Sequence, residues 1–493
     1  MTDNRVKRVL NAPIFAWTVM ALALLTVVVA VFFPIRSDDV FMYLALGRRM
    51  FNGGIPATDP FLFSMPNYHW HVLHEWGSYF FYYAAYLVGG FSGVIALKAL
   101  LIGLMVFVAG FPLIRKRSFL LIPLIILALY PGAERFEEKA SLFSDLFTLL
   151  LIRVLLSQNI SRKLWLIAVP ILFLLWSNLH PGMPLGFVIF GLVLAVKIFQ
   201  HDFVRAKLWS QSLALSVICC LANPLGLEGF LYPFEKVFSP DWQIFRKLFF
   251  EWRPTFTPGF STSFEVITLV AVWIVVAVVL LMNRRKKPIL EFIFFALMVY
   301  LGTDAIRFMM LASLGSLLIV SKFIAQIHFE AKYDRAGWLC AGILQLSLLL
   351  MICFNGYPTF NGTLFPGTGV NEDLLPVKAA DFIEQANWPG NMFNETNWGS
   401  YFAWRWDGQR KVFYHGHIDD PTFLDRTYMD AYRSPEKFDK LMHDYNIQIF
   451  VTTPQKLIAE NPRSIQNLIR HVDKDWKIAY FDPAAAVLFH LSK

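Results

Sequence analysis

Two adjacent acidic residues, Asp38 and Asp39, follow directly after the first long apolar run of the chain, Ile14 to Ile35. A run of that length can cross a hydrocarbon layer of about 30 Å, so both carboxylates are expected at a membrane–water boundary. There a carboxylate can act as a general base on a hydroxyl, at the depth of a lipid-linked phosphate. The same residues also suit a helix N-cap, because Ser37 or Asp38 precedes the amphipathic run Val40 to Met50. Spacing alone leaves both interpretations open.

Basic residues stand at the ends of later apolar runs. Guanidinium groups match phosphate in shape and charge, which makes these residues candidates for phosphate recognition. The alternative is that they pair with nearby acids or extend to the membrane surface. Arg307 is the strongest candidate, because the pattern places it deepest and close to Asp304. The set comprises Arg48, Arg49, Arg135, Lys139, Arg253 and Arg307.

The first long loop also holds nitrogen and oxygen donors at a spacing found in metal sites, namely His69, His71, His74 and Glu75. The pattern is not the HExxH arrangement, so we assign no metal ligand, and a divalent metal ion is only a possible cofactor.

A second polar group follows a later apolar run. His180 lies between Asn178 and Pro181. Its imidazole could orient a phosphate or a sugar by hydrogen bonding. Equally, it could cap the end of a membrane span.

The elements that position these residues are membrane helices. Of 493 residues, 56% are hydrophobic and 16% charged, against about 25% charged in a soluble domain. Mean hydropathy is +0.49, which excludes a typical soluble enzyme. We expect a mainly α, polytopic helical bundle with about 11 transmembrane helices, the first of them an uncleaved span. The apolar segments are 14–35, 92–114, 118–131, 141–157, 164–178, 182–199, 208–222, 264–282, 289–303, 306–327 and 337–354.

The orientation follows from basic clusters in alternate loops, such as Arg115-Lys116-Arg117 and Arg284 to Lys287. With a cytoplasmic N-terminus these clusters all fall inside, and the C-terminus falls outside a bacterial plasma membrane. The aromatic stretch Trp76 to Leu87 is interpreted as an interfacial helix, because a twelfth span would invert every later loop.

We therefore divide the chain into a membrane domain, 1–354, with a large external loop at 36–91, and an extracytoplasmic α/β domain, 355–493. In the second domain, strand-like runs at Lys411–Tyr414, Ile447–Thr452 and Ala485–His490 alternate with helical ones at Val377–Gln385 and Pro435–Tyr445.

Several functions are disfavoured by the sequence. The formal charge of +8 comes from short clusters between apolar runs rather than from one basic face, which disfavours nucleic acid as a partner. The sequence contains no GxxxxGK[ST] motif and no GxSxG motif, which disfavours ATP-driven transport and α/β-hydrolase chemistry. All four cysteines lie inside apolar runs, so they form no external disulfide framework.

The ordered external motifs resemble those of bacterial polytopic glycosyltransferases of the GT-C superfamily, most strongly the group related to the protein mannosyltransferase and aminoarabinose transferase families. The matching segments are Asp39-Val40-Phe41-Met42-Tyr43-Leu44, Gly47-Arg48, Pro56 to Phe61, His74-Glu75-Trp76, Trp176 to Gly182, Asn223 to Gly226 and Glu251-Trp252. The chain departs from the group's pattern at Tyr43, Pro181, His415 and His417. If those residues touch substrate, the departures imply a different acceptor.

This resemblance implies an enzyme that moves a sugar from a polyprenyl-phosphate carrier to an external acceptor, which is a protein, a lipid or a polysaccharide, by an inverting displacement. It implies that Asp39 is the catalytic acid–base residue or binds a divalent ion, with Asp38 as its neighbour. We expect the phosphate and substrate contacts to come from Arg307, Arg135, Arg48, His180, Asn178, His74 and Glu75.

Two other classes of protein remain open. A lipid-linked oligosaccharide polymerase or ligase also has many spans, and it would depend on external arginine and histidine rather than on Asp39. A non-catalytic transporter or assembly scaffold of envelope polysaccharide synthesis is the other class. A transporter is typically built from inverted repeats, and the sequence shows no convincing repeat.

Overall fold

The computed structural model describes residues 13–54, 57–69, 72–157, 161–239, 246–458, 465 and 476–491. The chain forms two compact units, each made of separate segments. The first, here the bundle unit, comprises residues 1–34, 95–237 and 246–368. The second, here the mixed unit, comprises residues 35–94, 238–245 and 369–493. The expected boundary at 354/355 does not coincide with these units, because residues 35–94 pack with residues 369–493.

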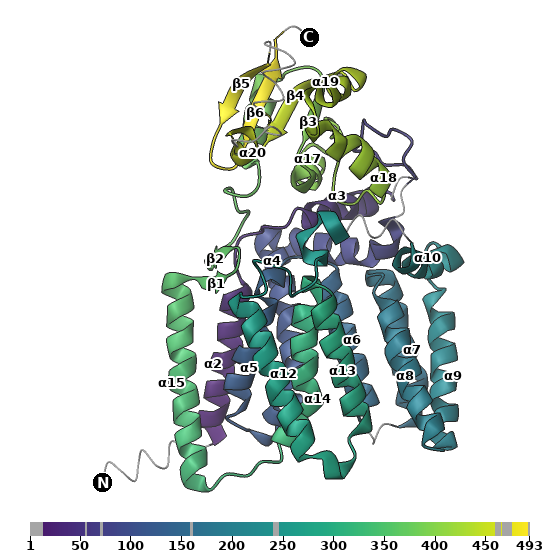
Figure 1. Ribbon diagram of the computed structural model, residues 1–493, viewed down its shortest axis with the longest axis vertical. Helices are drawn as coiled ribbons and strands as arrows, with labels where there is room; N and C mark the ends of the chain where they lie inside the picture. The colour runs from purple at the N-terminus through teal and green to yellow at the C-terminus, as the bar shows by residue number, and fades with distance from the viewer. Residues whose placement is uncertain are drawn as a thin grey trace. The chain divides into compact units, whose positions relative to one another are not determined.

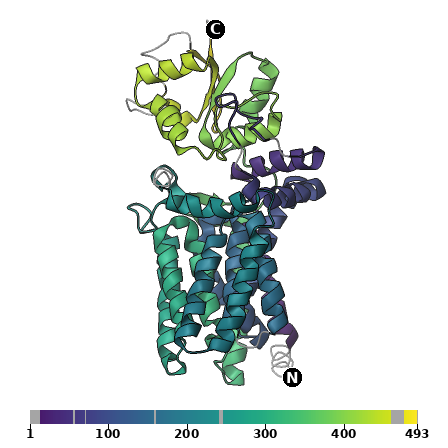
Figure 2. The same cartoon turned by 90° about the vertical axis from the view of Figure 1, so that its right-hand side faces the viewer.

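The bundle unit consists of long helices that run side by side, joined by short turns (Figures 1 and 2). Each of the eleven expected apolar segments is helical. Its elements are α2 (Pro13–Val31), the later part of α4 (Trp76–Lys116), α5 (Leu121–Leu129), η2 (Tyr130–Arg135), α6 (Ser141–Leu155), α7 (Arg162–Leu179), α8 (Met183–Phe199), α9 (Phe203–Cys220), α10 (Gly226–Phe238), η3 (Phe250–Trp252), α12 (Phe264–Met282), η4 (Arg284–Lys286), α13 (Ile289–Asp304), η5 (Ile306–Phe308), α14 (Met309–Ile324), α15 (Ala331–Asn355), and the antiparallel strands β1 (Tyr357–Thr359) and β2 (Gly362–Leu364).

Six helices in the described part of the chain are long and apolar enough to cross a membrane. They are Ile14–Val31, Trp76–Lys116, Arg162–Leu179, Phe264–Met282, Ile306–Ile324 and Ala331–Asn355. The remaining expected spans are shorter helices, such as α5 with 9 residues, except for α9, which has 18 residues but is less apolar. The chain is a polytopic membrane protein with a helical bundle and a small C-terminal sheet region, as the apolar pattern predicts.

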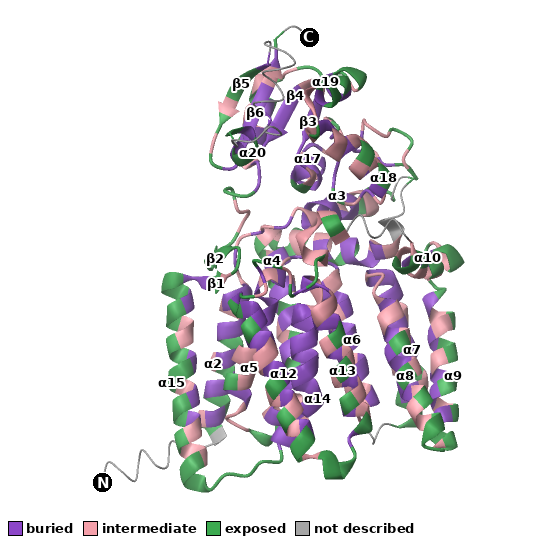
Figure 3. Ribbon diagram, viewed as in Figure 1, coloured by how far each residue is buried: buried purple, intermediate pink, exposed green. Residues whose placement is uncertain are grey.

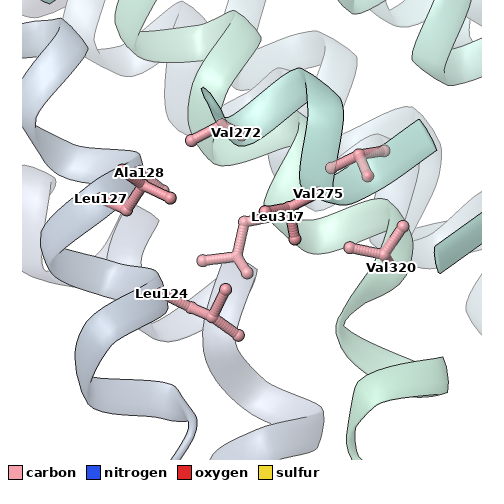
Figure 4. Close-up of a pocket in the computed structure, with 8 residues that line it drawn as sticks. Leu124, Leu127, Ala128, Val272, Val275, Leu317 and Val320 are labelled. Atoms are coloured by element: carbon pink, nitrogen blue, oxygen red, sulfur yellow. The ribbon is translucent and has the colours of Figure 1, made fainter. Parts of the chain in front are cut away.

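Helix α14 is the core of the bundle unit. Nearly all of its residues, from Met309 to Ile324, are buried, as expected for a helix that is apolar on every side and surrounded by other helices. Helix α15 differs, since most of its residues face outward (Figure 3). Between α5, α12 and α14 lies a small apolar cavity of about 10 Å³, lined only by aliphatic side chains such as Leu124, Val272 and Leu317 (Figure 4).

Helix α4 is interrupted at two glycines. Gly89 and Gly90 have non-helical backbone angles, and Gly90 has a φ of 57°, a conformation that favours glycine. The residues before this break include the predicted interfacial helix, Trp76 to Leu87, and they belong to the mixed unit. The break shows that this segment is a separate helical part. Its position at the membrane surface stays a prediction.

The mixed unit contains a four-stranded sheet with the strand order β3-β4-β6-β5. Strands β3 and β4 are parallel, and the other pairs are antiparallel. Its elements are α3 (Asp39–Asn52), η1 (Val72–Glu75), the first part of α4, α16 (Val377–Ala386), β3 (Asn391–Asn394), η6 (Thr396–Trp398), α17 (Gly399–Trp406), α18 (Pro421–Phe423), η7 (Leu424–Tyr428), η8 (Met429–Tyr432), α19 (Pro435–Asp444), β4 (Ile447–Thr452), α20 (Pro454–Ile458), β5 (Trp476–Phe481) and β6 (Ala486–His490).

Most of the secondary structure expected in the tail is confirmed. The predicted helices at 377–385 and 435–445 are α16 and α19, and the predicted strands at 447–452 and 485–490 are β4 and β6. The strand predicted at Lys411–Tyr414 is wrong. This segment forms only an isolated bridge, in which Val412 pairs with Leu62 of the first loop. Residues that favour strands did not produce a strand here, because the segment pairs with its neighbour at a single position.

Candidate functional site

The first candidate residue, Asp38, precedes α3, and its carboxylate lies at the N-terminal end of α17. It accepts hydrogen bonds from the backbone N–H of Ser400 (3.1 Å) and of Tyr401 (2.8 Å). It makes no capping bond to its own helix. The predicted capping bond to the helix at Val40 to Met50 is therefore not formed, and the carboxylate caps α17 instead. A carboxylate is favourable there because the first N–H groups of a helix have no intrahelical partner.

The environment of Asp38 changes its acidity. Burial favours the neutral form and is the main cause that raises the pKa of Asp38 to about 7, and the charge of Asp39 acts in the same direction. The hydrogen bonds from Ser400 and Tyr401 partly oppose this shift. Asp38 thus titrates near neutral pH while it holds α3 and α17 together.

Asp39, the proposed catalytic residue, is the first residue of α3 and is partly exposed. Its Oδ1 atom lies beside the segment His415-Gly416-His417 of the C-terminal part. An ideal Cβ atom built on Gly416 would be 3.5 Å from this oxygen. The structure therefore separates the two neighbouring acids: Asp38 binds a helix end, and Asp39 faces a glycine.

The segment 415–417 is fixed on both sides of Gly416. The His415 Nε2 atom lies 2.7 Å from Asp59 Oδ2, and both residues are buried. The His417 backbone N–H donates to His415 Nδ1, so the ring proton is on Nε2 and is donated to Asp59. The His417 ring packs edge-on against Tyr43 at 5.3 Å between centroids. Three of the four residues that depart from the family pattern are thus neighbours.

Arg48 and Arg49 lie at the other end of α17. The Arg48 Nη2 atom donates to the Trp404 carbonyl (2.5 Å), and Arg49 Nη2 donates to the Asp407 carbonyl (2.9 Å). Both guanidinium groups also pair with the Asp407 carboxylate, at 3.4 and 3.1 Å. Helices α3 and α17 therefore lie side by side and run in the same direction, with an acid at the positive end of α17 and cations at its negative end. These contacts favour a structural role for Arg48.

The histidine-rich part of the first loop forms no metal-like cluster in the described residues. No group of three or more His, Cys, Asp or Glu side chains is suitably placed there. His74 and Glu75 lie in η1, with His74 Nε2 3.9 Å from Glu75 Oε1, and Glu75 is buried. His69 pairs with Thr58 in an isolated bridge. His71 lies outside the described residues.

In the bundle unit, three cations converge on one carboxylate, Glu251 of η3. Arg135 of η2 forms a hydrogen-bonded ion pair with it, Lys139 Nζ lies 3.0 Å from Oε2, and Arg307 Nη1 lies 3.9 Å from Oε1. We call these four residues the cationic cluster. Burial opposes the charge of Glu251, but the three cations hold the pKa of this carboxyl well below its usual range.

The cationic cluster is built from the loops between helices. The Arg307 guanidinium stacks over the Trp252 ring, 3.8 Å from the centroid, which fixes its direction. The neighbouring acid predicted as a partner, Asp304, pairs instead with Arg246 at 2.8 Å. For Arg135, burial alone would favour the neutral form, but the charges of Glu251 and other nearby acids raise the pKa of its guanidinium. Both shifts favour the ionised forms of Arg135 and Glu251.

Asn178 lies in the last turn of α7, and His180 follows the end of that helix. The Ser144 hydroxyl lies 2.6 Å from His180 Nδ1, and it accepts a hydrogen bond of 2.7 Å from the Trp176 indole N–H. Asn178 Nδ2 donates to the Leu174 carbonyl (2.8 Å) and to the Ala222 carbonyl (3.1 Å). Asn178 thus ties the end of α7 to the end of α9, which is a structural role, whereas His180 is held in one orientation by Ser144.

The structure brings some predicted residues together and separates others. Arg135 and Arg307 meet in the cationic cluster of the bundle unit, and Lys139 joins them. Asp38, Asp39 and Arg48 belong to the mixed unit, as do His74 and Glu75. Sequence reasoning missed Glu251 as the centre of the cluster and the buried pair Asp59–His415. Glu251-Trp252 was recognised only as a family motif, and no local pattern marks its three partners.

Comparison with solved structures identifies the fold of this chain. No protein-family description matches the chain, and no curated protein matches its sequence. Among solved structures, ArnT from Cupriavidus metallidurans bound to undecaprenyl phosphate matches with a TM-score of 0.56 at 14% identity, over 97% of this chain and 98% of ArnT. The archaeal oligosaccharyltransferase AglB from Archaeoglobus fulgidus, in complex with an inhibitory peptide and a dolichol-phosphate, matches with a TM-score of 0.57 at 11% identity, over 89% of this chain and 69% of AglB. This chain has the GT-C fold.

A third solved structure with this fold is the arabinofuranosyltransferase AftD from Mycobacteria, with a TM-score of 0.52 at 12% identity, over 98% of this chain and 40% of AftD. The GT-C resemblance read from the external motifs is thus confirmed at the level of fold, and the chain is a multi-pass membrane protein. The match to ArnT extends over both units and over nearly the whole of ArnT.

Proposed function

We propose that this chain is a membrane glycosyltransferase that moves a sugar from a polyprenyl-phosphate carrier to an acceptor by an inverting displacement. The observation that carries the proposal is the cationic cluster in a chain with the GT-C fold. Support also comes from two structures of similar fold, ArnT bound to undecaprenyl phosphate and AglB bound to dolichol-phosphate.

The leaving group of this reaction is a lipid phosphate, whose negative charge grows as the bond to the sugar breaks. Preorganised cations stabilise such a charge more than water does, because they need no reorganisation during the reaction. Arg307 is the best placed candidate, since its guanidinium is oriented by Trp252 and its contact with Glu251 is the loosest of the three, at 3.9 Å. In the proposal, phosphate binds beside Arg307, and Glu251 keeps Arg135 and Lys139 in place.

The nucleophile is a hydroxyl of the acceptor, and its base is Asp39. The hydroxyl oxygen forms a bond to the anomeric carbon as the bond from that carbon to the phosphate oxygen breaks. The proton passes to the Asp39 carboxylate, and the bonding electron pair leaves with the lipid phosphate. A single displacement inverts the anomeric carbon. Asp38 is less suited to this role, because both of its oxygens accept hydrogen bonds from α17.

The compartment of the reaction is part of the proposal. In the bundle unit the loops that hold the cationic cluster alternate along the chain with the basic loops. Two of the basic loops are joined by a hydrogen bond of 2.9 Å from Lys286 Nζ to Gln326 Oε1. The positive-inside rule places such basic loops in the cytoplasm. The cationic cluster and the C-terminal residues would then be extracytoplasmic, where an acceptor on a protein, a lipid or a polysaccharide is available.

The proposal is tested by identifying the donor and then removing the base. Lipids that co-purify with the protein are identified by mass spectrometry, and the polyprenyl-phosphate sugar found is supplied in proteoliposomes with membrane fractions as a source of acceptor. Asp39→Asn should lower the rate of sugar loss from the carrier by about 100-fold or more, the usual contribution of a general base. Asp439→Asn, at an exposed acid of α19, is the control and should keep the wild-type rate. Parallel reactions with EDTA report any dependence on an exchangeable divalent ion.

Two outcomes would overturn the proposal. One is full transfer by a folded Asp39→Asn protein, and the other is the absence of polyprenyl-phosphate lipids together with no consumption of any supplied polyprenyl-phosphate sugar. Release of an oligosaccharide in one block, rather than of one sugar, would instead favour the ligase alternative.

A further inference from the structure

Gly416 is an exposed glycine that lies between two anchored histidines and next to the carboxylate of Asp39. Apart from its chain neighbours, an ideal Cβ atom at this position would have one heavy atom within 4 Å, the Oδ1 of Asp39 at 3.5 Å. Gly399 in the same unit differs, since its Cβ would lie 1.9 Å from the Tyr414 carbonyl oxygen. Packing therefore requires a glycine at 399, whereas at 416 it leaves open space next to a carboxylate.

Backbone strain does not account for Gly416 either. Its φ is outside the left-handed range that favours glycine, in contrast to Gly408, with a φ of 79°. An alanine at 416 would keep the backbone and meet no forbidden contact, because 3.5 Å is an ordinary van der Waals distance. What the glycine provides is room for a small group beside Asp39.

This space is held at a defined position relative to α3. His415 is bound to the buried Asp59 through a 2.7 Å hydrogen bond, and His417 packs against Tyr43. Tyr43 is four residues after Asp39, so both side chains lie on the same face of α3. Anchors on either side of Gly416 therefore keep its Cα at a fixed distance from the Asp39 carboxylate.

We propose that Gly416 is a specificity-determining position: it leaves room for the acceptor hydroxyl beside Asp39, with His415 and Asp59 as the positioning pair. This inference rests on the proposed function, because it names the place where the acceptor group meets its base. A hydroxyl that gives up its proton must come within about 2.6–3.2 Å of the carboxylate oxygen. A methyl group at 416 would occupy that space and would leave the carboxylate itself unchanged.

The test is Gly416→Ala, with Gly191→Ala in α8 as the matched control, since a Cβ at 191 meets no atom within 4 Å. In the transfer assay, Gly416→Ala should lower kcat/KM for the acceptor by about tenfold or more, the usual effect of one extra methyl in a substrate site. Gly191→Ala should keep the wild-type value. Neither variant should unfold below the wild-type temperature, which excludes misfolding as the cause; in the helix interior Gly191→Ala can only add stability.

A second readout needs no turnover. Asp39 is modified with a water-soluble carbodiimide and an amine, and the modified peptide is quantified by mass spectrometry, with the exposed Asp439 as internal reference. Gly416→Ala should reduce labelling at Asp39 relative to Asp439. Wild-type kcat/KM and wild-type labelling in a folded Gly416→Ala protein would overturn this inference. If Asp39→Asn is inactive in that case, the proposed function stands. If Asp39→Asn is active, the proposed function fails as well.

Discussion

The Asp38 carboxylate accepts a hydrogen bond of 2.8 Å from the backbone N–H of Tyr401, 363 residues further along the chain. This bond joins the first residues after the opening apolar helix to the start of α17. Its direct consequence is that the two adjacent acids, Asp38 and Asp39, have different surroundings and different expected roles. Asp38 binds the end of α17, whereas Asp39 is the proposed base.

Replacement of Asp38 should therefore affect stability. Asp38→Ala removes the acceptor for two N–H groups at the N-terminal end of α17, and loss of such a cap costs about 1 kcal/mol. We expect a lower thermal unfolding temperature of the purified protein in detergent, measured by intrinsic fluorescence. The exposed Asp439→Ala is the control. An unchanged unfolding temperature for Asp38→Ala would show that the cap contributes nothing.

The same residue predicts a pH dependence of stability. The pKa of Asp38 is raised to about 7 in the folded chain, chiefly by burial, from an ordinary value of 3.8. The folded state therefore binds this proton more tightly than the unfolded state does, and stability falls as the pH rises from about 4 to about 7. Unfolding at a series of pH values should show this decrease for the wild type. Asp38→Asn should flatten it, and an equally steep profile in that variant would assign the effect to another group.

Binding of the carrier lipid distinguishes two arginines that the sequence treats alike. Arg307→Ala should weaken retention of undecaprenyl phosphate by about tenfold, because a charge-assisted hydrogen bond to phosphate is lost. Arg48→Ala removes contacts to the end of α17, so it should leave retention unchanged and lower stability by less than about 1 kcal/mol. The measurement is native mass spectrometry of detergent-purified protein with added undecaprenyl phosphate. Equal retention by wild type and Arg307→Ala would remove this arginine from the phosphate site.

The orientation in the membrane can be tested with single cysteines. Lys440 in α19 has a highly exposed side chain, and Arg285 lies in an exposed turn between α12 and α13. In intact cells an impermeant maleimide should label Lys440→Cys, whereas Arg285→Cys should require permeabilised cells, because basic loops stay in the cytoplasm. The parent protein for both variants carries serine at its four natural cysteines. The opposite labelling pattern would invert the proposed topology.

The sequence predicted the helices better than the contacts. Apolar runs predicted helical segments such as α12 and α15, because burial in protein and lipid alike requires such runs. The convergence of Arg135 and Lys139 on Glu251 could not be predicted, since the residues are 116 and 112 positions from it and helix packing decides which loops meet. The Asp59–His415 pair, 356 positions apart, is a similar case.

The mixed unit has a consequence for how the protein is made. Its first segment, 35–94, is synthesised before most of the bundle unit, and its last, 369–493, comes at the end. The C-terminal partners of Asp38, Asp59 and Arg48 are therefore synthesised only after residues 95–368. In a chain that ends before residue 369, side chains of the segment 35–94 that are buried in the full chain, such as Asp59, would stay exposed.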